Sequence, residues 1–155
     1  MCPSFSLPGG DSLPHSETSM MNLLRLSFIP QSADLGLLIL RVSLGFSMLL
    51  LHGWAKFQNF NTIAPKFIRL FDVVPSHISL GMAVFAEVVC SVLIILGFFT
   101  RFAALNLAIT MAVAFFIQHK GQFTGPASGE LAFVYLVGFT TLVFAGSGKY
   151  AADGK

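Results

Sequence analysis

Four long apolar stretches, separated by polar loops, limit what this chain can fold into. They run from about Leu35 to His52, Ser79 to Phe99, Phe102 to His119 and Glu130 to Ala145. A helix needs roughly 17–25 residues to cross a bilayer, so the first three are long enough and the fourth is marginal. Backbone polar groups cannot stay unpaired in lipid, so helices are expected rather than strands. The pattern therefore predicts an all-α fold, an integral membrane antiparallel four-helix bundle.

Charge and cysteine content agree with a membrane protein and exclude other classes. Only 10% of the 155 residues are charged and 55% are hydrophobic, whereas soluble domains carry about 25% charged residues. The nine basic residues are scattered and form no basic stripe, which argues against a nucleic-acid partner. Cys2 and Cys90 lie far apart and make neither a disulfide framework nor a zinc motif.

The chain is expected to have two parts. Residues 1–33 are polar and rich in Pro, Ser and Gly, and they lack the pattern of a signal peptide. We interpret them as a mobile tail, or as a start-site extension, since Met20 and Met21 are also reasonable starts. Residues 34–155 form the predicted membrane domain.

Four helices place both chain ends on one surface, called side A, and the loops 52–77 and 121–129 on the other, side B. In the first of these loops, Ile63, Phe67, Leu70 and Phe71 share one helical face. This spacing suits a short amphipathic helix at the membrane surface, with a plain loop as the alternative. Lysines and arginines are equally frequent on the two sides, so the positive-inside rule leaves the orientation open.

Two ionisable residues fall inside the predicted spans. Each costs about 2.5–3.5 kcal/mol near the bilayer centre, so we expect Arg41 and Glu87 to form an ion pair. The pair has two interpretations. It fixes the register of the helices, or Glu87 carries protons or binds a ligand while the charge of Arg41 shifts the pKa of Glu87. On the second interpretation Glu87, Arg41 and His52, which ends the Arg41 face of its helix, are the candidate catalytic residues.

The histidines gather at side B. His52, His77, His119 and Glu130 all fall near helix ends there, but no local spacing supports a metal site, and none is predicted. His52 and His119 are instead candidates to hydrogen-bond the carbonyls of a quinone, because histidine exchanges protons near neutral pH. Asn106 shares a stripe with Thr110, from which both are expected to hydrogen-bond across the bundle.

These residues resemble a known pattern. The first part of the pattern is Arg41 and Gly45, followed by the run His-Gly-Trp-Ala-Lys that ends at Lys56. The second part is Glu87, followed by Leu-Gly-Phe-Phe-Thr-Arg-Phe-Ala-Ala at 96–104. The last part consists, in order, of His119, Glu130, Gly-Ser-Gly-Lys-Tyr at 146–150 and Asp153. Over residues 34–153 the chain resembles the DoxX family of small four-helix membrane proteins. Ala151 departs from the pattern, where the family often has Ser.

The resemblance implies a membrane subunit in a quinone-linked or thiol/sulfur-redox system. It adds Lys56 and Glu130 to His52, His119 and Asn106 as candidate ligand-binding residues. It also implies a cytoplasmic N-terminus in the inner membrane and a redox protein as partner, with a homo-oligomer left open. No dithiol, haem motif, Gly-rich nucleotide loop or iron–sulfur spacing occurs, so no intrinsic cofactor is expected and a quinone is the candidate ligand.

A second function class stays open at this point. The chain has no nucleophile with an adjacent base, and it is equally compatible with a non-catalytic membrane anchor, an assembly subunit or a small-solute permease. Whether it is an enzyme or an oxidoreductase subunit does not follow from the sequence.

Overall fold

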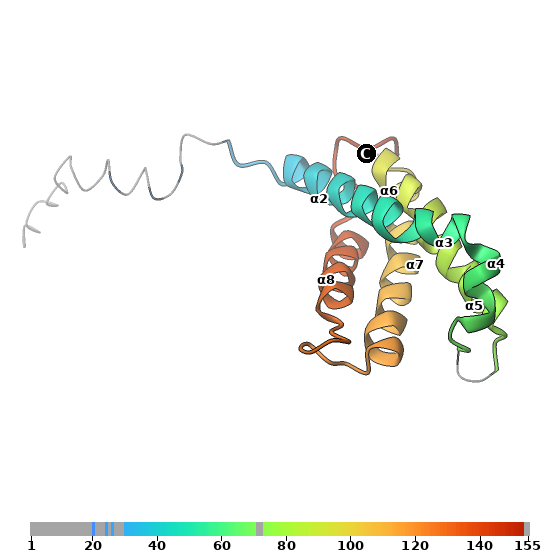
Figure 1. Cartoon of the computed structure of the whole chain (residues 1–155). Helices are drawn as coiled ribbons and strands as arrows, with labels where there is room; N and C mark the ends of the chain where they lie inside the picture. Colours follow the sequence, from blue (N-terminus) through green and yellow to red (C-terminus); the bar gives the residue numbers. More distant parts are fainter. Residues whose placement is uncertain (1–19, 21–23, 25, 27–29, 71–72, 154–155) are drawn as a thin grey trace, which may run out of the picture. The chain divides into compact units, whose positions relative to one another are not determined.

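The computed structural model describes residues 20, 24, 26, 30–70 and 73–153 (Figure 1). The chain divides into two compact units, Met1–Ser32 and Ala33–Lys155. Most of the first unit lies outside the described residues, so the mobile tail over residues 1–33 stays a prediction.

Among the residues that the structure describes, the second unit has four helical segments of 16 residues or more, with shorter helical turns between the first two. Three are long and apolar enough to cross a membrane, while the fourth has 16 residues. This agrees with the predicted lengths, and the described residues form no strand. The first segment, Ala33–Gln58, consists of α2 (Ala33–Met48), the π-helix η1 (Leu49–Gly53) and α3 (Trp54–Gln58). The second, Ser76–Leu96, consists of α5 (Ser76–Val84), the π-helix η3 (Phe85–Cys90) and α6 (Ser91–Leu96). The third, Thr100–Gln118, consists of α7 (Thr100–Val113) and the π-helix η4 (Ala114–Gln118), and the fourth is α8 (Glu130–Ala145).

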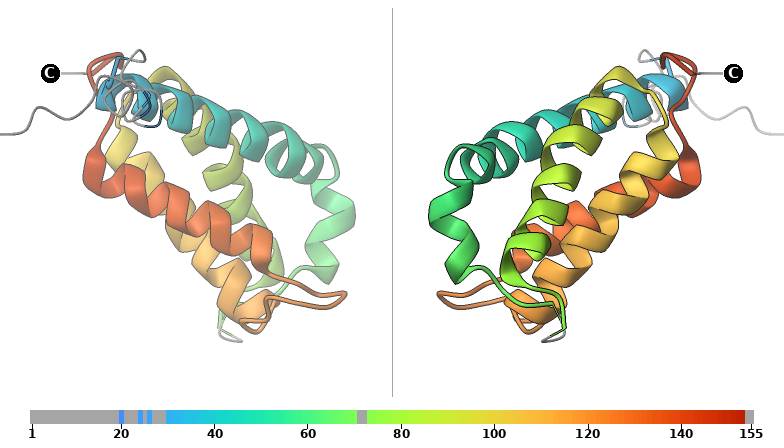
Figure 2. Two further views of the ribbon diagram at one scale, coloured as in Figure 1. Left: turned by 90° about the vertical axis from the view of Figure 1, so that its left-hand side faces the viewer. Right: turned by 90° about the vertical axis from the view of Figure 1, so that its right-hand side faces the viewer.

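The helices pack around a small apolar core. Helices α7 and α8 lie side by side, and α2 contacts both α6 and α8 (Figure 2). Leu107, Phe139 and Leu142 are completely buried, while Ile39, Leu51, Phe102 and Phe144 are exposed. Large apolar patches are rare on soluble monomers, and lipid covers them here. The predicted helical membrane bundle is thus confirmed.

Two glycines set the register between the first two spans. A Cβ on Gly45 would lie 2.7 Å from Cγ1 of Ile95, and a Cβ on Gly53 would lie 2.7 Å from the carbonyl oxygen of Glu87. The backbones therefore meet closely at both levels, and the antiparallel spans pair Gly53 with Glu87 and Gly45 with Ile95.

The C-terminal segment 146–153 closes side A. The backbone N–H of Lys149 donates to Oδ1 of Asp34 at 3.0 Å, at the start of α2. The N–H of Phe99, in the turn between α6 and α7, donates to Oδ2 of Asp153 at 2.8 Å. These bonds place the start of α2 and the C-terminal segment on the same side, as expected.

The connection between the first two spans forms no helix over residues 67–70, which fits the plain loop expected as the alternative. The first helix continues six residues beyond His52, to Gln58, and α4 (Phe60–Ile63) and the 3₁₀ turn η2 (Ala64–Lys66) follow. Pro65 lies in η2, and the chain becomes extended at Phe67. The amphipathic helix predicted from Ile63 to Phe71 is therefore wrong over residues 67–70, and Phe71 lies outside the described residues.

Candidate functional site

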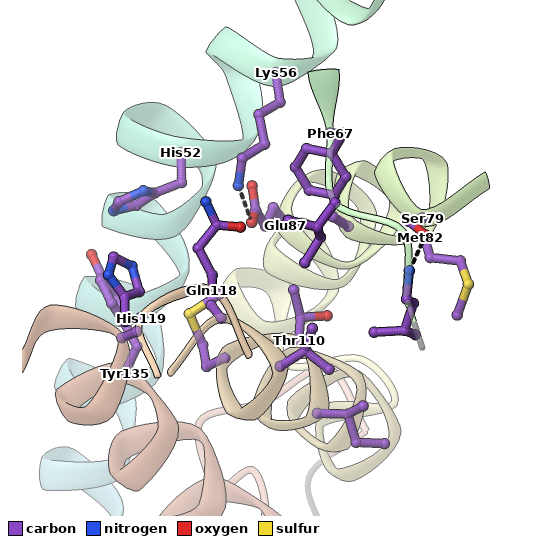
Figure 3. Close-up of a pocket in the computed structure, with 18 of the residues that line it drawn as sticks. His52, Lys56, Phe67, Ser79, Met82, Glu87, Thr110, Gln118, His119 and Tyr135 are labelled. Atoms are coloured by element: carbon purple, nitrogen blue, oxygen red, sulfur yellow. Dashed lines mark hydrogen bonds and ion pairs between the residues drawn. The ribbon is translucent and has the colours of Figure 1, made fainter. Parts of the chain in front are cut away.

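A hollow of about 420 Å³ lies between the helices toward side B (Figure 3). Side chains from all four helical segments and from the first loop line it. Among the described residues, eleven apolar and nine polar side chains line it, and most of the lining surface is apolar. The lining residues used below are His52, Lys56, Phe67, Ser79, Met82, Glu87, Ile109, Thr110, Gln118, His119 and Tyr135.

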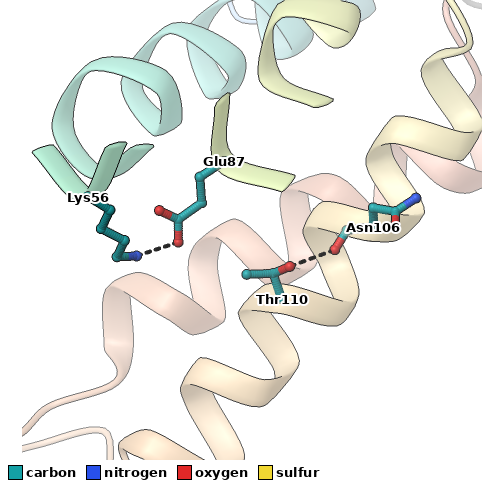
Figure 4. A network of polar contacts seen from close by, with 4 residues as sticks. All are labelled: Lys56, Glu87, Asn106 and Thr110. Carbon is teal, nitrogen blue, oxygen red and sulfur yellow. Dashed lines mark hydrogen bonds and ion pairs between the residues drawn. The ribbon is translucent and has the colours of Figure 1, made fainter. Parts of the chain in front are cut away.

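One ion pair occupies this hollow. Nζ of Lys56, on α3, lies 2.5 Å from Oε1 of Glu87, on η3 (Figure 4). The side chain of Glu87 is 2% exposed and that of Lys56 is 28% exposed. The second carboxylate oxygen, Oε2, is buried without a hydrogen-bond partner. A buried polar atom without a partner is unusual, and it indicates a place for a water or a ligand.

Two half-buried histidines line the same hollow. The ring of His52 meets the ring of Tyr135 edge-on, with centroids 5.6 Å apart, and its Nε2 is buried without a partner. His119 follows η4, and its Nδ1 donates to the carbonyl oxygen of Ala127 at 2.9 Å. That bond leaves the Nε2 of a neutral His119 as an acceptor. The ion pair and the two histidines thus offer one amine, one carboxylate oxygen and two imidazoles to the hollow.

Each of the three long spans changes to π-helix where it borders the hollow. Segment η1 carries His52, η3 carries Glu87 and η4 carries Gln118. A π turn is uncommon, costs regular hydrogen bonding, and occurs frequently at functional sites. Three such turns around one hollow mark this region as a candidate site.

The expected Arg41–Glu87 ion pair is wrong. Because Gly53 lies level with Glu87, Arg41 is twelve residues away along its helix, or about 18 Å at 1.5 Å per residue. Instead Nη2 of Arg41 donates to the carbonyl oxygen of Tyr150 in the C-terminal segment. Gly97 makes room for this guanidinium, because a Cβ there would lie 1.7 Å from Nη1. Arg41 therefore belongs to side A, away from the hollow.

Asn106 and Glu130 also lie outside the hollow, whereas Thr110 lines it. Nδ2 of Asn106 donates to the carbonyl oxygen of Phe102 at 2.9 Å. Oγ1 of Thr110 donates to the carbonyl oxygen of Asn106, also at 2.9 Å (Figure 4). Both bonds stay within α7, so the expected hydrogen bonds across the bundle are wrong. Glu130 is exposed at the start of α8 and does not line the hollow. Among the described residues, no three His, Cys, Asp or Glu side chains are close enough to hold a metal.

The structure brings together His52, Lys56, Glu87 and His119, and it adds residues that sequence reasoning did not single out as ligands. These are Ser79, Thr110, Gln118 and Tyr135. Gln118 and Tyr135 are polar positions at the side B ends of apolar helices, and that location was their only signal in the sequence.

Comparisons with known proteins agree on one family. A family model described as DoxX matches residues 36–120. Two proteins of Haemophilus influenzae, both named only "Uncharacterized protein", are similar to this chain. One is 39% identical over 124 residues, covering 77% of this chain and 89% of the relative. The other is 31% identical over 125 residues, covering 78% and 83%. No solved structure matches.

Proposed function

Since this chain is a multi-pass membrane protein of the DoxX family, we propose that it is a membrane subunit of a redox system and that a quinone binds between His52 and the Lys56–Glu87 pair. The observation that carries this proposal is the ion pair of the buried Glu87 carboxylate, which has one free oxygen in a mostly apolar hollow. Pockets of about 300–1,000 Å³ with few polar groups are typical of small-ligand sites.

The available polar atoms suit both states of a quinone. Lysine carries three donors, so Lys56 can still donate to a carbonyl oxygen while it contacts Glu87. His52 Nε2 is a second donor in one tautomer. The free Oε2 of Glu87 accepts a hydrogen bond from a hydroxyl group, which a quinol has and a quinone lacks.

Reduction of the quinone takes up two electrons and two protons, and this chain supplies places for the protons. The unpartnered Nε2 of His52 can take up or release a proton, because an imidazole nitrogen is an acceptor in one form and a donor in the other, and the Lys56–Glu87 ion pair lies in the same hollow. The two electrons come from a donor outside the chain, a sulfur oxyanion or a thiol, directly or through a protein partner. We place this system in the inner membrane, with side B facing out.

The test follows reduction of a soluble quinone analogue by thiosulfate, sulfite or a thiol, with purified protein in lipid discs. Wild type should catalyse reduction with one of these donors, and Glu87→Gln should abolish it while remaining folded. A folded wild type that neither binds nor reduces the analogue contradicts the proposal and supports an anchoring role.

A further inference from the structure

A second hollow lies beside the first, on the outer side of the bundle. It has about 410 Å³ and is bounded by α5, η3 and α7. Its lining is apolar except for Asn106 and Thr110, and it consists of Ile78, Gly81, Met82, Phe85, Ala86, Asn106, Ile109 and Thr110. We call it the α5–α7 groove.

The groove and the candidate site meet at three side chains. Met82, Ile109 and Thr110 line both of them. Met82 is 57% exposed and Ile109 is 56% exposed, on a surface that lipid covers. Methionine has three rotatable bonds and adapts to irregular shapes, so the wall between the hollow and the acyl chains outside includes a side chain that can move aside.

We propose that the α5–α7 groove holds the hydrocarbon tail of the ligand whose head group occupies the hollow. The ligand class is thus a long-chain, lipid-soluble quinone that reaches the site sideways from the bilayer. This inference rests on the function proposed above. The wall that the two spaces share and the apolar lining of the groove carry it. A tail in the groove stays in apolar surroundings, while a tail folded into the hollow would displace contacts with Lys56 and Glu87.

Gly81 offers a way to fill the groove without disturbing the site. It lies on α5, lines the groove but not the hollow, and a Cβ on it would meet nothing within 4 Å. Gly81→Phe therefore projects a ring into the groove without a backbone clash. Gly36 on α2 also has open space around its Cβ and lines neither space. Gly36→Phe is the matched control.

The experiment measures binding of two probes to protein in lipid discs. One is a decyl-substituted ubiquinone analogue, and the other is 2,3-dimethoxy-5-methyl-1,4-benzoquinone, the same head group without the tail. Comparing variants at one lipid concentration cancels partitioning into the bilayer. Gly81→Phe should weaken binding of the decyl probe about tenfold through lost tail contacts and leave the tailless probe within about twofold, and Gly36→Phe should change neither.

The outcomes separate the two proposals. Failure of wild type to bind either probe overturns both. Unchanged binding of both probes by Gly81→Phe overturns the groove proposal alone, and so does equal weakening of both. A decyl probe with a photoreactive group at its tail end gives a second readout on wild type: labelling of α5 and α7 residues of the groove supports the proposal, and labelling confined to other helices overturns it.

Discussion

The ammonium group of Lys56 lies 2.5 Å from the carboxylate of Glu87, and the two side chains differ greatly in exposure. The pair joins the end of the first span to the middle of the second, at the level where Gly53 allows the backbones to meet. It is therefore both a contact between helices and the polar centre of the hollow.

The difference in exposure predicts unequal costs of removing each partner. Lys56→Met leaves a buried carboxylate unpaired, which should lower the free energy of unfolding by roughly 3 kcal/mol. Glu87→Gln leaves the more exposed amine unpaired and should cost clearly less. Thermal unfolding in detergent, with the double variant to complete the cycle, measures this. If Glu87→Gln lowers the free energy of unfolding more than Lys56→Met does, the claim that an unpaired Glu87 carboxylate is the costlier of the two is contradicted.

Gly53 should tolerate no side chain. A Cβ there would lie 2.7 Å from the Glu87 carbonyl oxygen and 3.0 Å from Cγ2 of Val88, so Gly53→Ala should push η1 from η3, lower the melting temperature and weaken quinone binding. Gly36→Ala is the control, because its Cβ meets nothing. It should be neutral or stabilise by about 0.5–1 kcal/mol, as Gly→Ala usually does within helices. Equal melting temperatures for the two variants would contradict the close approach.

His52 should act through its nitrogen and not through its packing. His52→Phe keeps a ring for the edge-on contact with Tyr135 and removes the unpartnered Nε2. We expect an unchanged melting temperature and about tenfold weaker quinone binding, the value of one hydrogen bond of about 1.4 kcal/mol. His52→Ala, which loses the ring as well, should also be less stable. If His52→Phe binds the quinone with wild-type affinity, His52 does not hydrogen-bond the quinone.

Arg41 should matter for side A and not for the ligand. Arg41→Gln loses the bond to Tyr150 O, so the C-terminal segment should detach more often and trypsin should cut faster after Lys149. Quinone affinity should stay within about twofold, because Arg41 lies about 18 Å along its helix from the Glu87 level. Asp153→Asn, which weakens the bond from Phe99 N, should increase cleavage in the same way. Loss of quinone binding in Arg41→Gln with unchanged cleavage would restore the expectation drawn from the sequence.

Hydropathy predicted the membrane spans well, because the length of an apolar stretch follows from the residue types alone. It could not predict the three π turns, since nothing local distinguishes Leu49–Gly53 from the helix before it. The partner of Arg41 was missed for a related reason. Helix register depends on close contacts at Gly45 and Gly53 and on room at Gly97, and these appear only when the helices are packed. Lys56 was found through its family motif, but its partner required the structure.

The most direct test of the account is extraction of quinone from the purified protein. Wild type purified in lipid discs should retain quinone above the level of empty discs, and Glu87→Gln prepared in parallel, folded by its elution profile, should retain little. Wild-type protein that carries no more quinone than empty discs, or a Glu87→Gln variant that is equally loaded, would contradict the assignment of the Lys56–Glu87 hollow as the quinone site.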